Sequence, residues 1–186
     1  TAGLNLKYVG LVTGVGIVGL IGSVMAEPYR WIRLKAFFNP ALDAQGASFQ
    51  LKQSLIALGN GGLTGEGLGH GYQKAFYLPA AHTDVIFSVI GEELGLLGTA
   101  GLLLAFLLIF WRGMRAAHRA PDRFGFYLAL GLTSLLVLQA LTNMCVCLGL
   151  LPTKGLPLPF ISYGGSSLLA SMVATGLLLN VSQHSN

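Results

Sequence analysis

The segment Leu78-Pro79-Ala80-Ala81-His82-Thr83-Asp84-Val85-Ile86-Phe87-Ser88-Val89-Ile90-Gly91-Glu92-Glu93-Leu94-Gly95 joins a polar stretch of the chain to a strongly apolar one. It carries three of the seven acidic residues, with Asp84 just before the apolar run and Glu92 and Glu93 inside it. Carboxylates at the mouth of a membrane segment, or within it, are costly, so each is a functional hypothesis by default. The rest of the sequence has to show whether this run crosses a membrane.

The composition is that of an integral membrane protein. Of the 186 residues, 53% are hydrophobic and only 10% are charged, whereas a soluble domain usually carries about 25% charged residues. The apolar runs are long and continuous, which argues against a transmembrane β-barrel with its alternating pattern. The net charge of +4 comes from two basic clusters that follow membrane topology, so we expect no nucleic-acid partner. Cys145 and Cys147 match no zinc or redox motif and are expected to pack as small hydrophobes.

Four segments reach the length of about 20 mostly apolar residues that a helix needs to cross a bilayer. They are residues 8–26, 83–111, 124–151 and 166–181. The predicted fold class is therefore an all-α, polytopic membrane helix bundle. Small residues recur on these spans, which suits close helix packing in lipid: Gly14, Gly16, Gly19, Gly22, Gly95, Gly98 and Gly101. The chain begins Thr-Ala-Gly, and we expect no signal peptide and one C-terminal part, residues 1–186, of a longer polytopic domain.

Orientation follows from the arginines of residues 112–123, which are Arg112, Arg115, Arg119 and Arg123. Short cytoplasmic loops are enriched in basic residues, so this loop is predicted to be cytoplasmic. Residues 27–82 and 152–165 then form two outer loops. The first holds a cationic excess on the opposite side, at Arg30, Arg33, Lys35, Lys52 and Lys74. Either loops of this length escape the charge rule, or the cations bind an anionic ligand, and both explanations stay open.

Both outer loops are predicted to be structured. Residues 30–38 resemble an interfacial helix, and Ser48 is placed to cap a short amphipathic helix. The glycine-rich residues 59–71 lack the preceding strand and the Gly-Lys-Ser/Thr of a nucleotide loop, so they are predicted to be turns packed against other elements. Three prolines break the backbone of residues 152–165, and at membrane depth such backbone survives only against protein or a cavity. A serine near residue 166 is a plausible cap of the last helix.

The carboxylates of the opening segment have structural as well as functional readings. Asp84 fits an ordinary N-cap of the second span, which is a common role of Asp. Glu92 and Glu93 lie about 12 to 13 Å further down a helix at 1.5 Å per residue, too deep to share a substrate group with Asp84. We expect them to pair with polar side chains such as Asn143 or Gln139, although a cavity-lining role stays open.

Three motifs together resemble the SEDS family (shape, elongation, division and sporulation) of polytopic peptidoglycan glycosyltransferases. They are residues 50–54 followed by 59–69, residues 78–84 followed by 91–95, and residues 152–167. They span nearly the whole chain, and residues 152–155 look more like the division-type branch than the elongation-type one. The family has more spans than four, so the chain resembles its C-terminal portion. Ala80 departs from the family, which often has a Glu there.

The resemblance implies polymerisation of the lipid-linked precursor lipid II into septal glycan strands at the outer face of the bacterial cytoplasmic (inner) membrane. Asp84 aligns with the family's outer-loop aspartate, which implies a general base for the acceptor hydroxyl, with undecaprenyl pyrophosphate as leaving group. The implied partners are lipid II, undecaprenyl-linked glycan, membrane lipid, a class B penicillin-binding protein transpeptidase and other divisome proteins. No metal site is predicted, although a divalent cation on the pyrophosphate stays open. The implied substrate-binding residues are Arg33, Lys35, Lys74, Lys154, Ser162, Gly164, Gly165 and Ser166, and Glu92, Glu93 and Asn143 are expected to be structural or cavity-lining.

Two other functions fit the same sequence. Intramembrane acids and a proline-broken helix also suit a lipid II transporter (flippase), and a non-catalytic divisome scaffold would present its spans to a partner. The sequence favours the glycosyltransferase because the charged groups gather at the predicted outer surface rather than along the spans.

Overall fold

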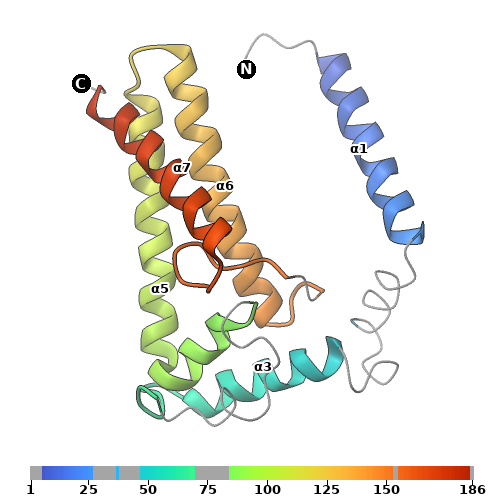
Figure 1. Cartoon of the computed structure of the whole chain (residues 1–186), viewed down its shortest axis with the longest axis vertical. Helices are drawn as coiled ribbons and strands as arrows, with labels where there is room; N and C mark the ends of the chain where they lie inside the picture. The colour runs from blue at the N-terminus through green and yellow to red at the C-terminus, as the bar shows by residue number, and fades with distance from the viewer. Residues whose placement is uncertain (1–5, 27–36, 38–46, 70–83, 153–154, 185–186) are drawn as a thin grey trace. The chain divides into compact units, whose positions relative to one another are not determined.

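In the computed structural model the chain is helical, and the residues that it describes are 6–26, 37, 47–69, 84–152 and 155–184. Figure 1 shows their helices and no strand, which confirms the predicted all-α fold. The chain divides into two compact units, residues 1–48 and 49–186, which are described separately. In order, the helices are α1 (Leu6–Ala26), α3 (Ala47–Gly61), α5 (Ile86–His118), α6 (Arg123–Cys147) and α7 (Gly165–Gln183).

The first unit contains α1, which covers the predicted span of residues 8–26. Apolar side chains such as Tyr8, Leu11 and Val18 are exposed along it. Exposed apolar side chains on a helix of this length suit a membrane segment. The interfacial helix predicted over residues 30–38 lies outside the described residues except for Phe37.

The second unit is built on α5, α6 and α7, each long and apolar enough to cross a membrane. The three helices pack against one another, around a core that includes Ala117, Leu136 and Ala174. Large side chains such as Leu97 and Leu169 point outward and are 70% and 65% exposed. A water-soluble protein rarely exposes so much apolar surface, so this outer face suits lipid.

α5 and α6 come very close together at Gly113. A Cβ added there would overlap the side chain of Thr133 on α6. Small residues permit such close helix crossings in membranes, but Gly113 is not among the glycines that we expected to do so. Gly101, which is among them, has nothing within 4 Å of an added Cβ. Among the described residues, close packing through a small residue of α5 is thus seen against α6 at Gly113 and not at Gly101.

The predicted second span is not one continuous helix, because α5 breaks at Gly95. This residue has φ 65° and ψ −159°, a backbone conformation that essentially only glycine adopts. Figure 1 shows the part of α5 before the break at a clear angle to the long part after it. α5 also continues beyond the predicted end at Trp111 to His118, so most of the predicted 112–123 loop is helical.

The glycine-rich segment of residues 61–67 fills the break in α5. The N–H groups of Glu66 and Gly67 donate to the carbonyls of Glu92 and Glu93, at 3.0 and 3.1 Å. On the other side of the break, Leu96 N–H donates to the Gly62 carbonyl at 2.9 Å and Leu97 N–H to the Leu63 carbonyl at 3.3 Å. A broken helix leaves such groups without intrahelical partners, and this is costly away from water. The segment supplies the missing partners, which confirms the predicted turns packed against another element.

Close contact between this segment and α5 requires glycine on both sides. A Cβ on Gly65 would overlap the backbone of Glu93, and a Cβ on Gly95 would overlap the backbone of Gly65 and Leu63. Gly61 lies equally close to the backbone of Gly91. The glycines therefore bring two backbones within hydrogen-bonding distance.

α3 fastens the first part of α5 to the end of α6. Ser54, on α3, donates from Oγ to the Cys147 carbonyl at 2.9 Å and is hydrogen-bonded to the Ser88 hydroxyl. All three residues are buried, and Ala57 on the same helix is completely buried. The helix α3 is thus tied to both α5 and α6.

Two helix caps that the sequence suggested are absent. The N-caps of α5 and α7 are Val85 and Gly164, neither with a side-chain cap bond, while Ser48 lies inside α3, which begins at Ala47. The cap that does form is at α6, where Asp122 Oδ1 accepts from the Gly125 N–H at 3.0 Å. Asp84 and Ser166 are therefore not N-caps.

Candidate functional site

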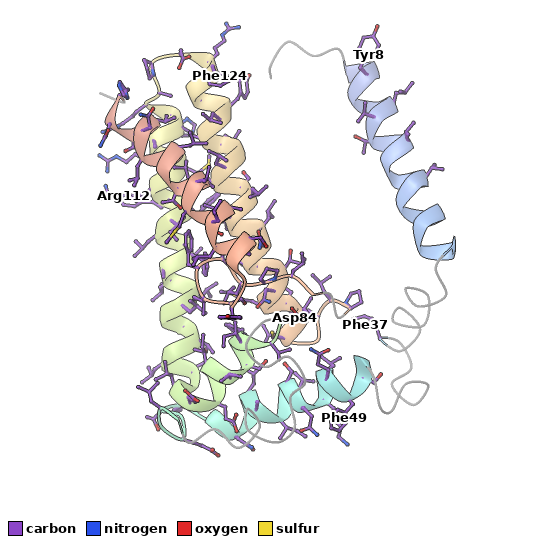
Figure 2. All side chains as sticks on the ribbon, in the orientation of Figure 1. Tyr8, Phe37, Phe49, Asp84, Arg112 and Phe124 are labelled. Carbon is purple, nitrogen blue, oxygen red and sulfur yellow. The ribbon has the colours of Figure 1, made fainter. Side chains whose placement is uncertain are left out.

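Asp84 lies directly before α5, where the first part of that helix meets the end of α6 and the second predicted outer loop (Figure 2). It is half-buried, and its backbone carbonyl accepts a hydrogen bond of 2.9 Å from Asn143 Nδ2. Since Val85 is the N-cap of α5 and no side chain caps it, the Asp84 carboxylate is not used to begin the helix. The cap explanation of this residue is wrong.

The carboxylate of Asp84 lies against Gly155 of the second loop. A Cβ added to Gly155 would be 3.1 Å from Asp84 Oδ2 and 3.6 Å from Oδ1. This spacing is tighter than a side chain ordinarily accepts, so glycine lets the loop approach the carboxylate. The second predicted outer loop thus reaches Asp84, although the two are far apart in the sequence.

Asn143 on α6 holds the two sides of this contact together. Its side-chain Nδ2 donates to the carbonyls of Asp84, at 2.9 Å, and of Leu156, at 2.6 Å. Asn143 is 1% exposed, and buried amides usually have their hydrogen bonds satisfied. One turn earlier, Gln139 Nε2 donates to the Pro157 carbonyl at 2.8 Å. The expectation that these amides pair with Glu92 or Glu93 is wrong, because they bond to backbone on either side of the site.

The rest of the second loop is folded back on itself. The Leu158 N–H donates to Ser162 Oγ at 2.7 Å, and the Ser162 N–H donates to the Leu158 carbonyl at 3.0 Å. Between them Phe160 takes φ 67°, which is uncommon and strained for a bulky residue. Ser162 is buried, so its hydroxyl shapes the loop here, whereas a substrate contact by it stays a prediction.

The beginning of α7 borders a cavity of about 290 Å³ between α6, α7 and the second loop. Gly164 is the extended N-cap, and Gly165 begins the helix with nothing within 4 Å of an added Cβ. Ser166 lines the cavity together with Gln139 and Pro157. This places one of the predicted substrate-binding residues at an opening beside the loop that Gln139 anchors.

Glu92 and Glu93 lie on the first part of α5, just before the break at Gly95. Glu92 is completely buried and Glu93 is 9% exposed. Since their carbonyls accept from the glycine-rich segment, both residues lie level with the loop that we predicted outside the membrane, and not deep in a continuous span. A structural role for Glu92 and Glu93, distinct from the role of Asp84, stays a prediction.

Some predicted site residues cannot be placed. Arg33, Lys35, Lys74 and Lys154 lie outside the described residues, as does His82. Within the described part of the chain, no three His, Cys, Asp or Glu side chains come together in a way that could hold a metal ion. The anionic-ligand explanation of the outer-loop cations therefore stays a prediction.

The sequence pointed to Asp84 but missed what surrounds it. Gly155 lies inside the third motif, but no role in the site was predicted for this residue from the sequence. The signal that could have indicated a close contact there is its position between a lysine and a segment with two prolines. Asn143 was predicted to be structural, but with the wrong partners. Its carbonyl partners belong to segments 59 and 13 positions away, and no local pattern reports such contacts.

Comparison with known proteins gives consistent results. The model of the cell cycle protein family FTSW_RODA_SPOVE matches residues 1–186. A probable peptidoglycan glycosyltransferase FtsW of Geobacter sp. (strain M18) is 50% identical over 97% of this chain and 49% of its own length. Stage V sporulation protein E of Bacillus subtilis (strain 168) is 45% identical over 99% of this chain and 50% of its own.

A solved structure agrees with the fold. A chain from work on "Structural coordination of polymerization and crosslinking by a peptidoglycan synthase complex" matches with a TM-score of 0.65 and 30% identity, over 96% of this chain and 50% of its own. The chain thus spans about half the length of the relatives that it matches. With the family model covering it from end to end, this chain belongs to the cell cycle protein family FTSW_RODA_SPOVE, as its motifs predicted.

Proposed function

We propose that the full-length protein is a peptidoglycan glycosyltransferase that polymerises lipid II, with Asp84 as general base. The observation that carries this proposal is the half-buried Asp84 carboxylate beside Gly155, with its backbone fixed by Asn143 and its side chain not used as a helix cap. A base has to be fixed within hydrogen-bond reach of the proton that it removes. The names of the FtsW relatives support the same reaction class.

In the proposed reaction the acceptor hydroxyl of a fresh lipid II attacks the anomeric carbon of the growing chain. The hydroxyl proton passes to the Asp84 carboxylate, the oxygen forms the new glycosidic bond, and the bond from that carbon to the pyrophosphate breaks. A positioned base of this kind typically contributes about 10²- to 10⁴-fold. The pyrophosphate leaves with its charge, and Arg33, Lys35, Lys74 and Lys154 are the proposed residues that neutralise it.

The proposed setting is the cytoplasmic (inner) membrane of a bacterium, with the site at the outer face. Residues 112–123, at the other end of the bundle, carry the arginines that mark a cytoplasmic side. The proposed partner is a class B penicillin-binding protein transpeptidase in a divisome. The likeness to a chain from a peptidoglycan synthase complex supports a partner of this kind.

The test is polymerisation of purified lipid II by the full-length protein, with glycan length measured on a gel. Asp84→Asn keeps the shape of the side chain and removes the base, so we expect at least a hundredfold slower polymerisation with unchanged thermal unfolding. An Asp84→Asn protein that polymerises at the wild-type rate would falsify the base assignment. A wild-type protein that moves lipid II across vesicles without making glycan would favour the transporter.

A further inference from the structure

A second cavity lies at the opposite end of the bundle from Asp84. It measures about 490 Å³ and lies between the last turns of α5 and the second half of α7. Arg112, Arg115 and Arg119 line it on one side, and Figure 2 labels Arg112 on the part of α5 far from Asp84. On the other side, α7 contributes Thr175, Leu178 and Leu179.

The cavity is strongly cationic. The three arginines are exposed and recur at a spacing that puts them on one face of a helix. None of the residues described as lining the cavity is acidic. The one acid in residues 112–123 is Asp122, whose Oδ1 caps α6 through the Gly125 N–H. An anion in the cavity would therefore meet several guanidinium groups.

The position of the arginines along α5 matches a membrane boundary. At 1.5 Å per residue, about 25 Å of helix separates Gly95 from Arg112, and about 36 Å separates it from Arg119. The hydrocarbon core of a bilayer is about 30 Å thick. Trp111, one residue before Arg112, has the guanidinium carbons of Arg112 and Arg115 at 6.0 and 5.7 Å from its ring centre. Tryptophan is enriched at the level of the lipid headgroups.

We propose that this cavity binds the phosphate headgroup of an anionic phospholipid from the cytoplasmic leaflet. The arginines hold the phosphate, since guanidinium groups form two parallel hydrogen bonds to its oxygens. Leu178 and Leu179 meet the beginning of the acyl chains on the membrane side. Basic pockets between transmembrane helices on the cytoplasmic side are typical sites for anionic lipid headgroups. The site does not depend on the glycosyltransferase proposal.

The test is native mass spectrometry of the full-length protein in detergent with added phosphatidylglycerol, and with phosphatidylcholine as the zwitterionic comparison. We expect the wild type to retain phosphatidylglycerol preferentially. Each arginine near a membrane surface contributes about fivefold to anionic-lipid affinity, so R112Q/R115Q/R119Q should weaken retention about a hundredfold. Arg123→Gln is the matched control, because Arg123 belongs to the same basic cluster but does not line the cavity, and it should cost less than fivefold.

Three results would overturn the proposal. The first is unchanged phosphatidylglycerol retention by the triple Gln variant, and the second is equal retention of phosphatidylcholine by the wild type. The third is displacement of the lipid by an equal concentration of inorganic phosphate, which would indicate a site for a free anion. R112K/R115K/R119K keeps the charge and should retain the lipid within about fivefold of wild type. If the triple Gln variant does not elute as a single species, the three single Gln variants serve instead, each with an expected fivefold loss.

Discussion

Replacing Asn143 with Leu tests whether the candidate site depends on the hydrogen bonds by which Asn143 holds Asp84 and the second loop together. The substitution keeps the γ-branched shape of the side chain, although its two methyl groups are bulkier than the amide, and it removes the hydrogen bonds to the Asp84 and Leu156 carbonyls, at 2.9 and 2.6 Å. A buried carbonyl left without a partner costs about 1 to 3 kcal/mol, so two would cost about 2 to 6 kcal/mol if both stayed dry. Gly155, next to Leu156, is exposed, so water can replace part of this bonding. We therefore expect about 1 to 3 kcal/mol, which leaves the bundle folded.

The effect on catalysis should be larger than the effect on stability. Without the shared amide, the carboxylate and the second loop are no longer held to one another, and a shift of about 1 Å at a reacting group can cost about a hundredfold. We expect Asn143→Leu in the full-length protein to lower kcat for lipid II polymerisation about 10- to 100-fold, with KM nearly unchanged. Asn143→Asp keeps the shape but leaves at most one donor, the carboxyl O–H, for the two carbonyls, so it should also lower kcat.

Thr142→Val is the control for Asn143→Leu. Thr142 is the neighbouring residue on α6, is half-buried, and its hydroxyl donates within its own helix, to the Leu138 carbonyl at 2.7 Å. It should keep wild-type kcat. The anchoring role would be refuted if Asn143→Leu polymerised within twofold of wild type. It would also be refuted if kcat fell only in proportion to the fraction of unfolded protein, measured by thermal unfolding in the same detergent.

Two glycine substitutions test the close approaches beside the site. Gly155→Val places a branched side chain where even a Cβ lies 3.1 Å from Asp84 Oδ2, so the rate of polymerisation should fall at least tenfold with little loss of stability. The control, Gly176→Val, lies in open space on α7 and should leave the rate unchanged. Equal rates for the two variants would contradict a role for the close contact between Gly155 and Asp84. Gly95→Ala should lower the unfolding temperature by several degrees more than Gly101→Ala, because alanine at a positive φ is strained and its Cβ would overlap the glycine-rich segment. Equal shifts for the two alanine variants would mean that the break in α5 does not need glycine.

The helices could be predicted because a membrane span requires only length and apolar composition. All four predicted spans contain a helix, but the end of α5 was placed too early. The stop was set at Arg112, where charge begins, although residues 112–118 include Arg, Met and Ala, which are good helix formers. Charge marks where a helix leaves the membrane, and helix propensity decides where it stops.

The break in α5 could not be predicted from α5 itself. Gly95 and Gly98 are both glycines in the same apolar run, yet only Gly95 leaves the helical conformation. The difference lies in what packs against them. The atoms nearest to an added Cβ on Gly98 belong to the side chain of Leu94, one turn back in its own helix, whereas those nearest to one on Gly95 belong to the backbone of Leu63 and Gly65. A contact with a segment some thirty positions earlier leaves no mark on the periodicity of the helix.

The candidate site also lies at irregular backbone that is stabilised by contacts between segments far apart in the sequence. Inside a membrane protein an interrupted helix persists only if every freed carbonyl and N–H finds a partner. The break at Gly95 is completed by residues 61–67, and the proline-broken loop is completed by Gln139 and Asn143. Asn143 thus fixes the backbone at Asp84 and at Leu156 without using the Asp84 carboxylate, as the proposed general base requires. A continuous helix through Gly95 would have its backbone groups bonded internally and would offer the glycine-rich segment no free partners.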